Sequence, residues 1–132
     1  MNKVLLQADP PADIHVALAW IHMLPLDNAI TAGCLARTIR DPRVHHFDDP
    51  QKRAGAAVAT SLGATGKVAW DIYLFYPPGS RWQNGLPAPA AWAHQLQGSS
   101  WADPLHYNHG EDLVRQLTIG LAALRRGKAE KT

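Results

Sequence analysis

Short apolar runs alternate with apolar positions at helical spacing along the chain. Residues 14–20 form an almost continuous apolar run, which is typical of a strand covered on both faces. Asp27 or Asn28 can cap a following helix, and the Asp41-Pro42 pair ends it because a residue before proline is pushed out of the α region. The apolar positions of this helix recur at helical spacing: Ile30, Cys34, Leu35 and Ile39. Cys34 is therefore predicted to be a buried apolar residue.

The alternation continues through the middle of the chain. Residues 43–47 are predicted to form a second short strand. Asp49-Pro50 then predicts a helix start, with an acceptor at the N-cap and proline at the first helical position. Gly63 is placed to end this helix. Its apolar positions step by four: Ala54, Val58 and Leu62.

The second part of the chain predicts a hairpin and a closing helix. Residues 67–76 form the strongest predicted strand, and the prolines and glycine of residues 77–80 predict a turn. Arg81-Trp82 is predicted to begin a short returning strand. A helix follows, with Glu111 and Asp112 in its first turn and one apolar face: Leu113, Leu117, Leu121 and Leu124.

The predicted order is β-α-β-α-β-β-α. Strands that alternate with helices imply parallel pairing through right-handed crossovers, and the tight turn adds one antiparallel pair. We therefore expect a single α/β domain spanning residues 1–132, with a mixed β-sheet flanked by helices.

Residues 77–109 fit this order least well. They are mostly irregular and contain five of the ten prolines, which predicts a long ordered loop with a short helix at 90–95. The segment also gathers three tryptophans and three histidines: Trp82, Trp92, Trp101, His94, His106 and His109. Together with Tyr107, the tryptophans can either line an apolar pocket for a small molecule or pin the loop to the domain.

The element order and three local runs resemble the thioredoxin-like superfamily. The runs are residues 46–50 (His-Phe-Asp-Asp-Pro), 54–58 (Ala-Gly-Ala-Ala-Val) and 71–75 (Asp-Ile-Tyr-Leu-Phe), the last followed by a Pro-Gly turn. They are similar to the C-terminal half of thioredoxin-like and peroxiredoxin-like proteins. The resemblance covers roughly residues 13–83 and 111–124, and it implies a thioredoxin-like sheet.

The departures from that family concern its redox chemistry. The family's reactive cysteine lies at a helix N-terminus, usually within Cys-x-x-Cys, whereas Cys34 is the single cysteine and lies well inside its predicted helix. The family's cis-proline would fall near Trp70-Asp71, where no proline is present. Classical thiol–disulfide exchange is therefore not supported, and a redox-inactive protein is expected.

Two arrangements of the sheet remain open at this point. In one, the strand at 14–20 is central and the loop at 23–28 occupies the position of the family's active site. In the other, the family's first strand and helix are missing, and the sheet is completed by Lys3–Gln7, by a partner chain, or not at all. Because an uncovered strand edge invites pairing, we expect a homodimer.

Charge and hydropathy restrict the classes of partner that we expect. The net charge of +2 comes from a basic tail at residues 125–132, expected to fray, and no basic stripe appears elsewhere, so no nucleic acid is expected. No apolar run approaches ~18 residues and no signal peptide is recognised, so no membrane span and a cytoplasmic location are expected. No cofactor is expected either, because neither a Gly-x-Gly-x-x-Gly motif nor a P-loop is present.

The remaining candidates for chemistry are histidines and aromatic residues. His45 and His46 are adjacent in a strand and point to opposite faces, so they cannot easily share one metal ion. The metal hypothesis names four residues: His45, Asp48, His106 and His109. The ligand or interface candidates are Trp70, Asp71, Trp82, Trp92, His94, Trp101 and Tyr107.

Two functions from different classes follow. The first is a redox-inactive thioredoxin-like binding or self-association module. The second is a small enzyme or metal-binding protein that uses His45, His46 and the loop at 77–109. No catalytic residue is assigned.

Overall fold

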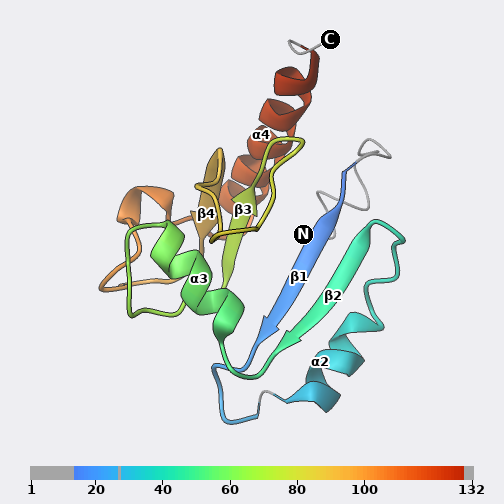
Figure 1. The fold of residues 1–132 in the computed structure, drawn as a ribbon, viewed down its shortest axis with the longest axis vertical. Helices are drawn as coiled ribbons and strands as arrows, with labels where there is room; N and C mark the ends of the chain where they lie inside the picture. Colours follow the sequence, from blue (N-terminus) through green and yellow to red (C-terminus); the bar gives the residue numbers. More distant parts are fainter. Residues whose placement is uncertain (1–13, 27, 130–132) are drawn as a thin grey trace.

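The computed structural model describes residues 14–26 and 28–129, and it is a mixed α/β fold (Figure 1). The β-α-β-α-β-β-α order predicted from the sequence is confirmed, with a short 3₁₀ helix added before the last helix. The elements are β1 (Val16–Ile21), α2 (Ala29–Ala36), β2 (Val44–Asp49), α3 (Arg53–Ser61), β3 (Ile72–Phe75), β4 (Ala91–His94), η1 (Pro104–His106) and α4 (Gly110–Ala129).

The strands form two pairs. β1 and β2 pair in parallel from Val16↔Val44 to Ile21↔Asp49, as a β-α-β unit requires. β3 and β4 pair antiparallel, with Ile72 opposite His94. Within residues 14–26 and 28–129, no ladder joins one pair to the other, so the described strands make two small sheets and not the one mixed sheet expected from the sequence.

The hydrophobic core lies between α4 and the β3–β4 pair. Leu113 and Leu117 are buried on α4 against Ala93 of β4, and partly buried residues surround them: Tyr73, Phe75, Val114 and Leu121. The predicted leucine face of the last helix is therefore confirmed where it meets the sheet. Gly120 lets the helix approach closely, because a Cβ there would lie 2.7 Å from the Phe75 ring.

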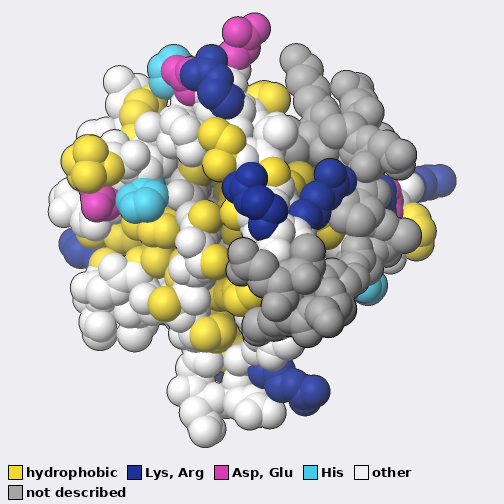
Figure 2. All heavy atoms as spheres, turned by 90° about the horizontal axis from the view of Figure 1, so that it is seen from above, with side chains coloured by type: hydrophobic (Ala, Val, Ile, Leu, Met, Phe, Trp, Pro, Cys, Tyr) yellow, Lys and Arg dark blue, Asp and Glu magenta, His cyan; other side chains and the backbone are white. Residues whose placement is uncertain are grey.

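The β1–β2 pair is covered unevenly. The sequence predicted a first strand covered on both faces, and this is wrong, because β1 alternates between half-buried and exposed residues. Val16, Leu18 and Trp20 are half-buried, whereas Ala17 and Ala19 are exposed. Figure 2 shows hydrophobic side chains reaching the surface on the face seen from above, among scattered Lys and Arg side chains.

α2 turns its predicted apolar face outward. Asn28 is its N-cap, as one of the two predicted candidates, but the helix ends at Ala36, well before Asp41. Cys34 is exposed, so its predicted burial is wrong. The physical reason is that the helix packs through small residues, with Ala32 buried, so the side of Ile30 and Cys34 is left facing solvent.

The hairpin differs most from the prediction. The strand predicted at 67–76 is reduced to Ile72–Phe75, because Asp71 adopts a left-handed φ of 52° that breaks the extended run. The returning strand is Ala91–His94, so the prediction of a strand at Arg81-Trp82 is wrong. The prediction of a short helix at 90–95 is also wrong, because residues 91–94 form the strand β4. The 77–109 segment is therefore not one long loop, since β4 and η1 lie within it.

α3 and α4 keep their predicted ends only in part. α3 begins at Arg53, after a left-handed Lys52, and not at Pro50. Gly63 follows the C-cap with a φ of 85°, as predicted for a helix-ending glycine. α4 continues through Arg125 and Arg126 to Ala129, into the segment predicted as a frayed tail. No helix in the described part of the chain has the length and apolar character needed to cross a membrane.

Candidate functional site

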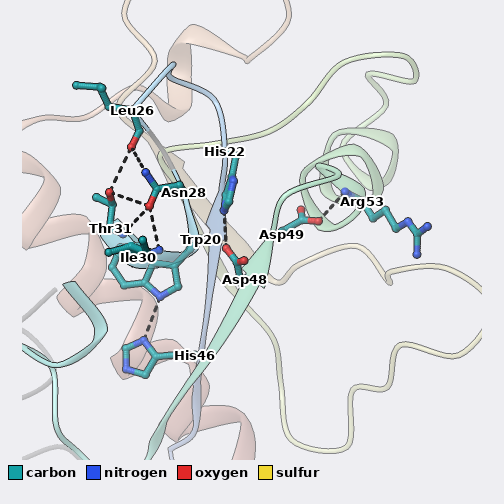
Figure 3. Close-up of polar contacts among 10 residues, drawn as sticks. All are labelled: Trp20, His22, Leu26, Asn28, Ile30, Thr31, His46, Asp48, Asp49 and Arg53. Carbon is teal, nitrogen blue, oxygen red and sulfur yellow. Dashed lines mark hydrogen bonds and ion pairs between the residues drawn. The ribbon is translucent and has the colours of Figure 1, made fainter. Parts of the chain in front are cut away.

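Polar side chains gather where the parallel strands β1 and β2 end. His22 follows β1 directly, and its Nε2 donates to Asp48 Oδ1 at 2.5 Å (Figure 3). The register explains the contact: Trp20 lies opposite Asp48, and His22 is two residues further along the chain, so its side chain is on the same face as Asp48. The carboxyl ends of parallel strands are where α/β proteins bind their ligands.

A second contact joins the same two strands two residues earlier in each of them. The Trp20 indole N–H donates to His46 Nδ1 at 3.1 Å, and the two rings lie nearly parallel with centroids 6.0 Å apart. The other ring nitrogen of His46 lies 3.2 Å from the Ile39 carbonyl oxygen. Since Nδ1 accepts a hydrogen bond, Nε2 carries the proton and donates to Ile39. His46 therefore ties β2 to both β1 and the segment after α2.

Asn28 organises the loop that connects β1 to α2. Its side-chain oxygen accepts from the backbone N–H groups of Ile30 and Thr31, each at 2.9 Å, which caps the helix. Its amide nitrogen donates to the Leu26 carbonyl at 3.2 Å, and the Thr31 hydroxyl donates to the same oxygen at 3.2 Å. Figure 3 shows these contacts closing the loop onto the first turn of the helix.

A small hollow lies between the end of β1 and α2. Its volume is about 50 Å³, and its lining is Trp20, Ile21, His22, Asn28, Thr31, Ala32 and Leu35. Ligand pockets for drug-sized molecules are roughly 300–1,000 Å³. A carboxylate that orients an imidazole is a general acid–base arrangement, but this hollow has room only for a few waters or the tip of one side chain.

Four large hydrophobic side chains between the end of β1 and the end of α2 are exposed, and one of them, Leu35, lines the hollow. Leu26 and Ile30 are 82% and 80% exposed, and Leu24 and Leu35 are 59% and 47% exposed. We call Leu24, Leu26, Ile30 and Leu35 the α2 patch. Leu35 is on the side of α2 that lines the hollow, whereas Ile30, five residues earlier, lies on another side of the helix.

The β1–β2 pair has a second exposed apolar area. Ala17 and Ala19 of β1 share one face of the pair with His45 and Phe47 of β2, and all four are exposed. His15 precedes β1 on this side and stacks on His45, with ring centroids 5.8 Å apart. We call these five residues the open face. α3 packs on the two strands near their carboxyl ends, where Ile21 approaches Gly55.

Five of the predicted candidates meet around β4. The rings form a continuous series of contacts, with the closest pair, Trp92 and His106, stacked at 4.0 Å: His106, Trp92, His94, Tyr107 and His109. His94 is 1% exposed, accepts from the Leu96 N–H at 3.1 Å and donates to the Asp103 carbonyl at 2.9 Å. Both nitrogens of His94 are used within the fold, which identifies it as a structural residue.

The other ligand or interface candidates lie outside that ring series. Asp71 precedes β3, and its carbonyl accepts from the Gln95 N–H at 3.0 Å. Burial raises the pKa of the Asp71 carboxyl. Trp70 is 37% exposed and Trp82 is 55% exposed, whereas Trp101 is half-buried.

The four residues of the metal hypothesis are not brought together. His45 lies on the open face, Asp48 pairs with His22, and His106 and His109 lie in the aromatic series around β4. Among the residues whose placement is described, no group of three His, Cys, Asp or Glu side chains is positioned to hold a metal ion.

Asp49 has the structural role that its position suggested. It is buried, and its carboxylate accepts from the backbone N–H groups of Arg53, Ala54 and Gly55 at 2.8, 2.9 and 3.3 Å. These are the amides of the first helical turn that have no partner inside α3. The carboxylate thus acts as the cap, although the helix starts later than predicted.

The sequence reasoning did not identify the His22–Asp48 pair or the α2 patch. In one of the two arrangements that the sequence left open, the loop at 23–28 would take the position of the thioredoxin family's active site; His22 precedes this loop, and Leu24 and Leu26 lie in it. The available signal was polar residues directly after two parallel strands. No protein-family model, curated protein or solved structure matches this chain.

Proposed function

We propose that the chain is a redox-inactive binding module of thioredoxin-like architecture that associates with a second copy of itself. The open face carries this proposal. A parallel pair is normally covered on both faces, but here Phe47 is 56% exposed beside exposed Ala17 and Ala19. The same face of a second copy offers a complementary apolar cover, which is the geometry of an isologous dimer.

The thioredoxin-like architecture is supported by the element order and the sense of strand pairing. That fold joins a parallel β-α-β unit to an antiparallel hairpin through a helix and closes with a further helix. β1–α2–β2, α3, β3–β4 and α4 follow this order, with the corresponding parallel and antiparallel pairs. A ladder between β1 and β3 would complete the four-stranded sheet.

The redox-inactive assignment rests on the position of Cys34. It lies in the second turn of α2, whereas the first turn, where unbonded amides can stabilise a thiolate, is occupied by the Asn28 cap. Cys34 is also the single cysteine of the chain, so no second thiol of the same molecule can resolve a mixed disulfide.

Light scattering after size exclusion tests the dimer directly. The full chain is expected to elute with the mass of a dimer at micromolar concentration. Phe47→Glu places a charge in the open face and is expected to weaken the dimer by about thirtyfold or more. A wild-type chain that remains monomeric up to the highest soluble concentration would overturn the proposal.

Leu105→Glu is the control for this test. Leu105 lies on η1 and is 88% exposed, away from the open face, so the same kind of charge is introduced on a single exposed leucine. It is expected to leave the dimer unchanged. Equal weakening by both substitutions would show that net charge, and not the open face, controls association.

A further inference from the structure

The connection between β3 and β4 contains the chain's one asparagine that is followed by glycine, Asn84-Gly85. Both residues are exposed, and both lie in the irregular backbone that joins the two strands (Figure 1). Gly85 has a φ of 109°, a conformation that side chains rarely adopt, so a glycine is needed at this position. Because glycine has no side chain, its backbone nitrogen is also open to approach from the residue before it.

The ends of this connection are fixed by hydrogen bonds, whereas its middle is not. Ser80 donates from its backbone N–H and from its hydroxyl to the Pro77 carbonyl, at 3.2 and 2.7 Å. The Ala90 N–H donates to the Phe75 carbonyl at 2.8 Å. Between these contacts, residues 81–89 make no backbone-to-backbone hydrogen bond within the described part of the chain. The backbone of this stretch can therefore change conformation without breaking the β3–β4 ladder.

The Asn84 side chain is not held by the fold, in contrast to the other two described asparagines. Asn28 caps α2, and its amide nitrogen donates to a loop carbonyl at 3.2 Å. The Asn108 amide nitrogen donates to a backbone carbonyl at 3.1 Å. Neither the Asn84 side chain nor the Gly85 N–H has a hydrogen-bond partner among residues 14–26 and 28–129. The side-chain carbonyl of Asn84 is therefore free to turn toward the Gly85 nitrogen.

We infer that Asn84 is a site of spontaneous deamidation, which converts it to aspartate and isoaspartate. The Gly85 nitrogen loses its proton to water, and its lone pair attacks the side-chain carbonyl carbon of Asn84. The new C–N bond closes a succinimide ring, and the side-chain amide group takes up a proton and leaves as ammonia. Water then adds to either carbonyl of the ring and breaks its bond to the nitrogen, which leaves a normal or a β-linked aspartate. Water is the one co-reactant that this covalent change requires.

The modification changes the charge of this loop and leaves the open face untouched. Each event replaces a neutral amide by a carboxylate, so the formal net charge of the chain falls by one unit from +2. The new carboxylate follows Arg81, which is exposed on the same loop. The loop connects β3 and β4, whereas the open face lies on β1 and β2, so deamidation of Asn84 does not depend on self-association.

Peptide mapping by mass spectrometry tests this inference on the full chain, kept folded in mildly alkaline buffer and sampled over time. The chain carries its own controls, because Asn28 and Asn108 precede Ala29 and His109 and are held by hydrogen bonds. We expect Asn84 to deamidate at least about tenfold faster than either of them, with isoaspartate among its products. A sample unfolded in guanidinium chloride should react at Asn84 at a rate within about threefold of the folded chain. Asn84 reacting no faster than the other two asparagines, or protected by folding beyond that margin, would overturn the inference.

Variants then assign the reaction to this pair of residues. Asn84→Gln is expected to remove both the isoaspartate and the acidic species that ion exchange separates, because the longer side chain closes a ring less readily. Asn84→Asp is expected to elute with that acidic species from the start. Gln83→Glu is the matched control, because it adds the same charge at the neighbouring exposed position and should leave the deamidation of Asn84 in place. An acidic species that accumulates at the wild-type rate in Asn84→Gln would place the reaction elsewhere and reject the site.

Discussion

The N-terminal half of the molecule (β1, α2, β2 and α3) and the C-terminal half (β3, β4, η1 and α4) bury different kinds of side chain. In the C-terminal half, Leu113 and Leu117 of α4 are buried against β4. In the N-terminal half, the buried apolar side chains of helices and strands are alanines, Ala32 and Ala59. Its larger apolar residues are half-buried or exposed, and they include five of the nine exposed large hydrophobics among the described residues: Leu24, Leu26, Ile30, Leu35 and Phe47.

Polar contacts take the place of a large apolar core in the N-terminal half. Trp20 with His46, His22 with Asp48, and Asp49 with the start of α3 all join neighbouring elements there. Such contacts give directional positioning but each adds only about 0.5–1.5 kcal/mol to stability, less than burying a leucine. From this difference in burial we expect the C-terminal half to contribute more of the stability, whereas the N-terminal half carries the exposed face that we propose for self-association.

The largest effect is expected when the stability losses caused by removing one histidine from each half are compared. His94→Ala removes a side chain that is 1% exposed and leaves the Leu96 N–H and the Asp103 carbonyl without their partner, so we expect a loss of about 2–4 kcal/mol. His45→Ala removes an exposed ring from the open face and should cost less than about 1 kcal/mol. Urea unfolding of both variants measures the difference. Similar losses would contradict the assignment of stability to the C-terminal half.

Two glycines sharpen the comparison within the N-terminal half. A Cβ at Gly55 would lie 2.7 Å from the Ala69 carbonyl oxygen and 2.9 Å from Ile21 Cδ1, so Gly55→Ala is expected to cost about 1–3 kcal/mol. Gly33 lies inside α2 with open space around it, so Gly33→Ala should stabilise the protein by about 0.5–1 kcal/mol. Thermal unfolding, with denaturant unfolding as a control, should show a loss of stability for Gly55→Ala and a gain for Gly33→Ala. A loss of stability at both positions would mean that the higher helix propensity of alanine does not stabilise α2.

Two adjacent carboxylates provide a smaller contrast. Asp49 is buried and accepts three backbone N–H groups at the start of α3, so Asp49→Ala is expected to cost about 1–2 kcal/mol. Asp48 makes one partly exposed pair with His22, and Asp48→Ala should cost at most about 1 kcal/mol. Hydrogen exchange of the α3 amides distinguishes the two, because only Asp49→Ala should increase their exchange selectively.

The order and type of the elements could be predicted because each strong pattern is local. Helical spacing in α4, the cap at Asn28 and the end of α3 at Gly63 depend on residues close in sequence. The hairpin was mispredicted because β4 pairs with β3 across a long connection. An Ala-rich run at 90–95 fits a helix as well as a strand, and only pairing with Ile72–Phe75 decides between them.

The candidate site could not be predicted from local patterns, because it depends on contacts between residues that are distant in the sequence. The face of α2 was misassigned because apolar residues occur on more than one side of the helix, with Ile30 exposed and Ala32 buried. Packing against the strands, and not the spacing, decides which side is covered. His22 and Asp48 meet only because of the β1–β2 register, so the pair could be found from the sequence only by first predicting that register.

The smallest predicted effect concerns acid and the segment that leads into β2. Hydrogen bonds from the Arg43 side chain and backbone lower the pKa of Asp41 from 3.8 to about 2. A carboxyl whose pKa is lowered on folding stabilises the protein above its unfolded value, and this contribution is lost as pH falls from about 4 toward 2. Asp41→Asn should therefore lower the urea midpoint slightly at pH 5 and converge with the wild type near pH 2.

The control for this titration is Asp112, which pairs with Arg115 on the exposed surface of α4. Both side chains of this ion pair are largely exposed, so Asp112→Asn should change the urea midpoint little at either pH. If Asp41→Asn showed the same small change at pH 5 as at pH 2, the Asp41–Arg43 contact would contribute nothing to folding. The N-terminal half would then depend still more on its helix caps and on the side-chain hydrogen bonds between its strands.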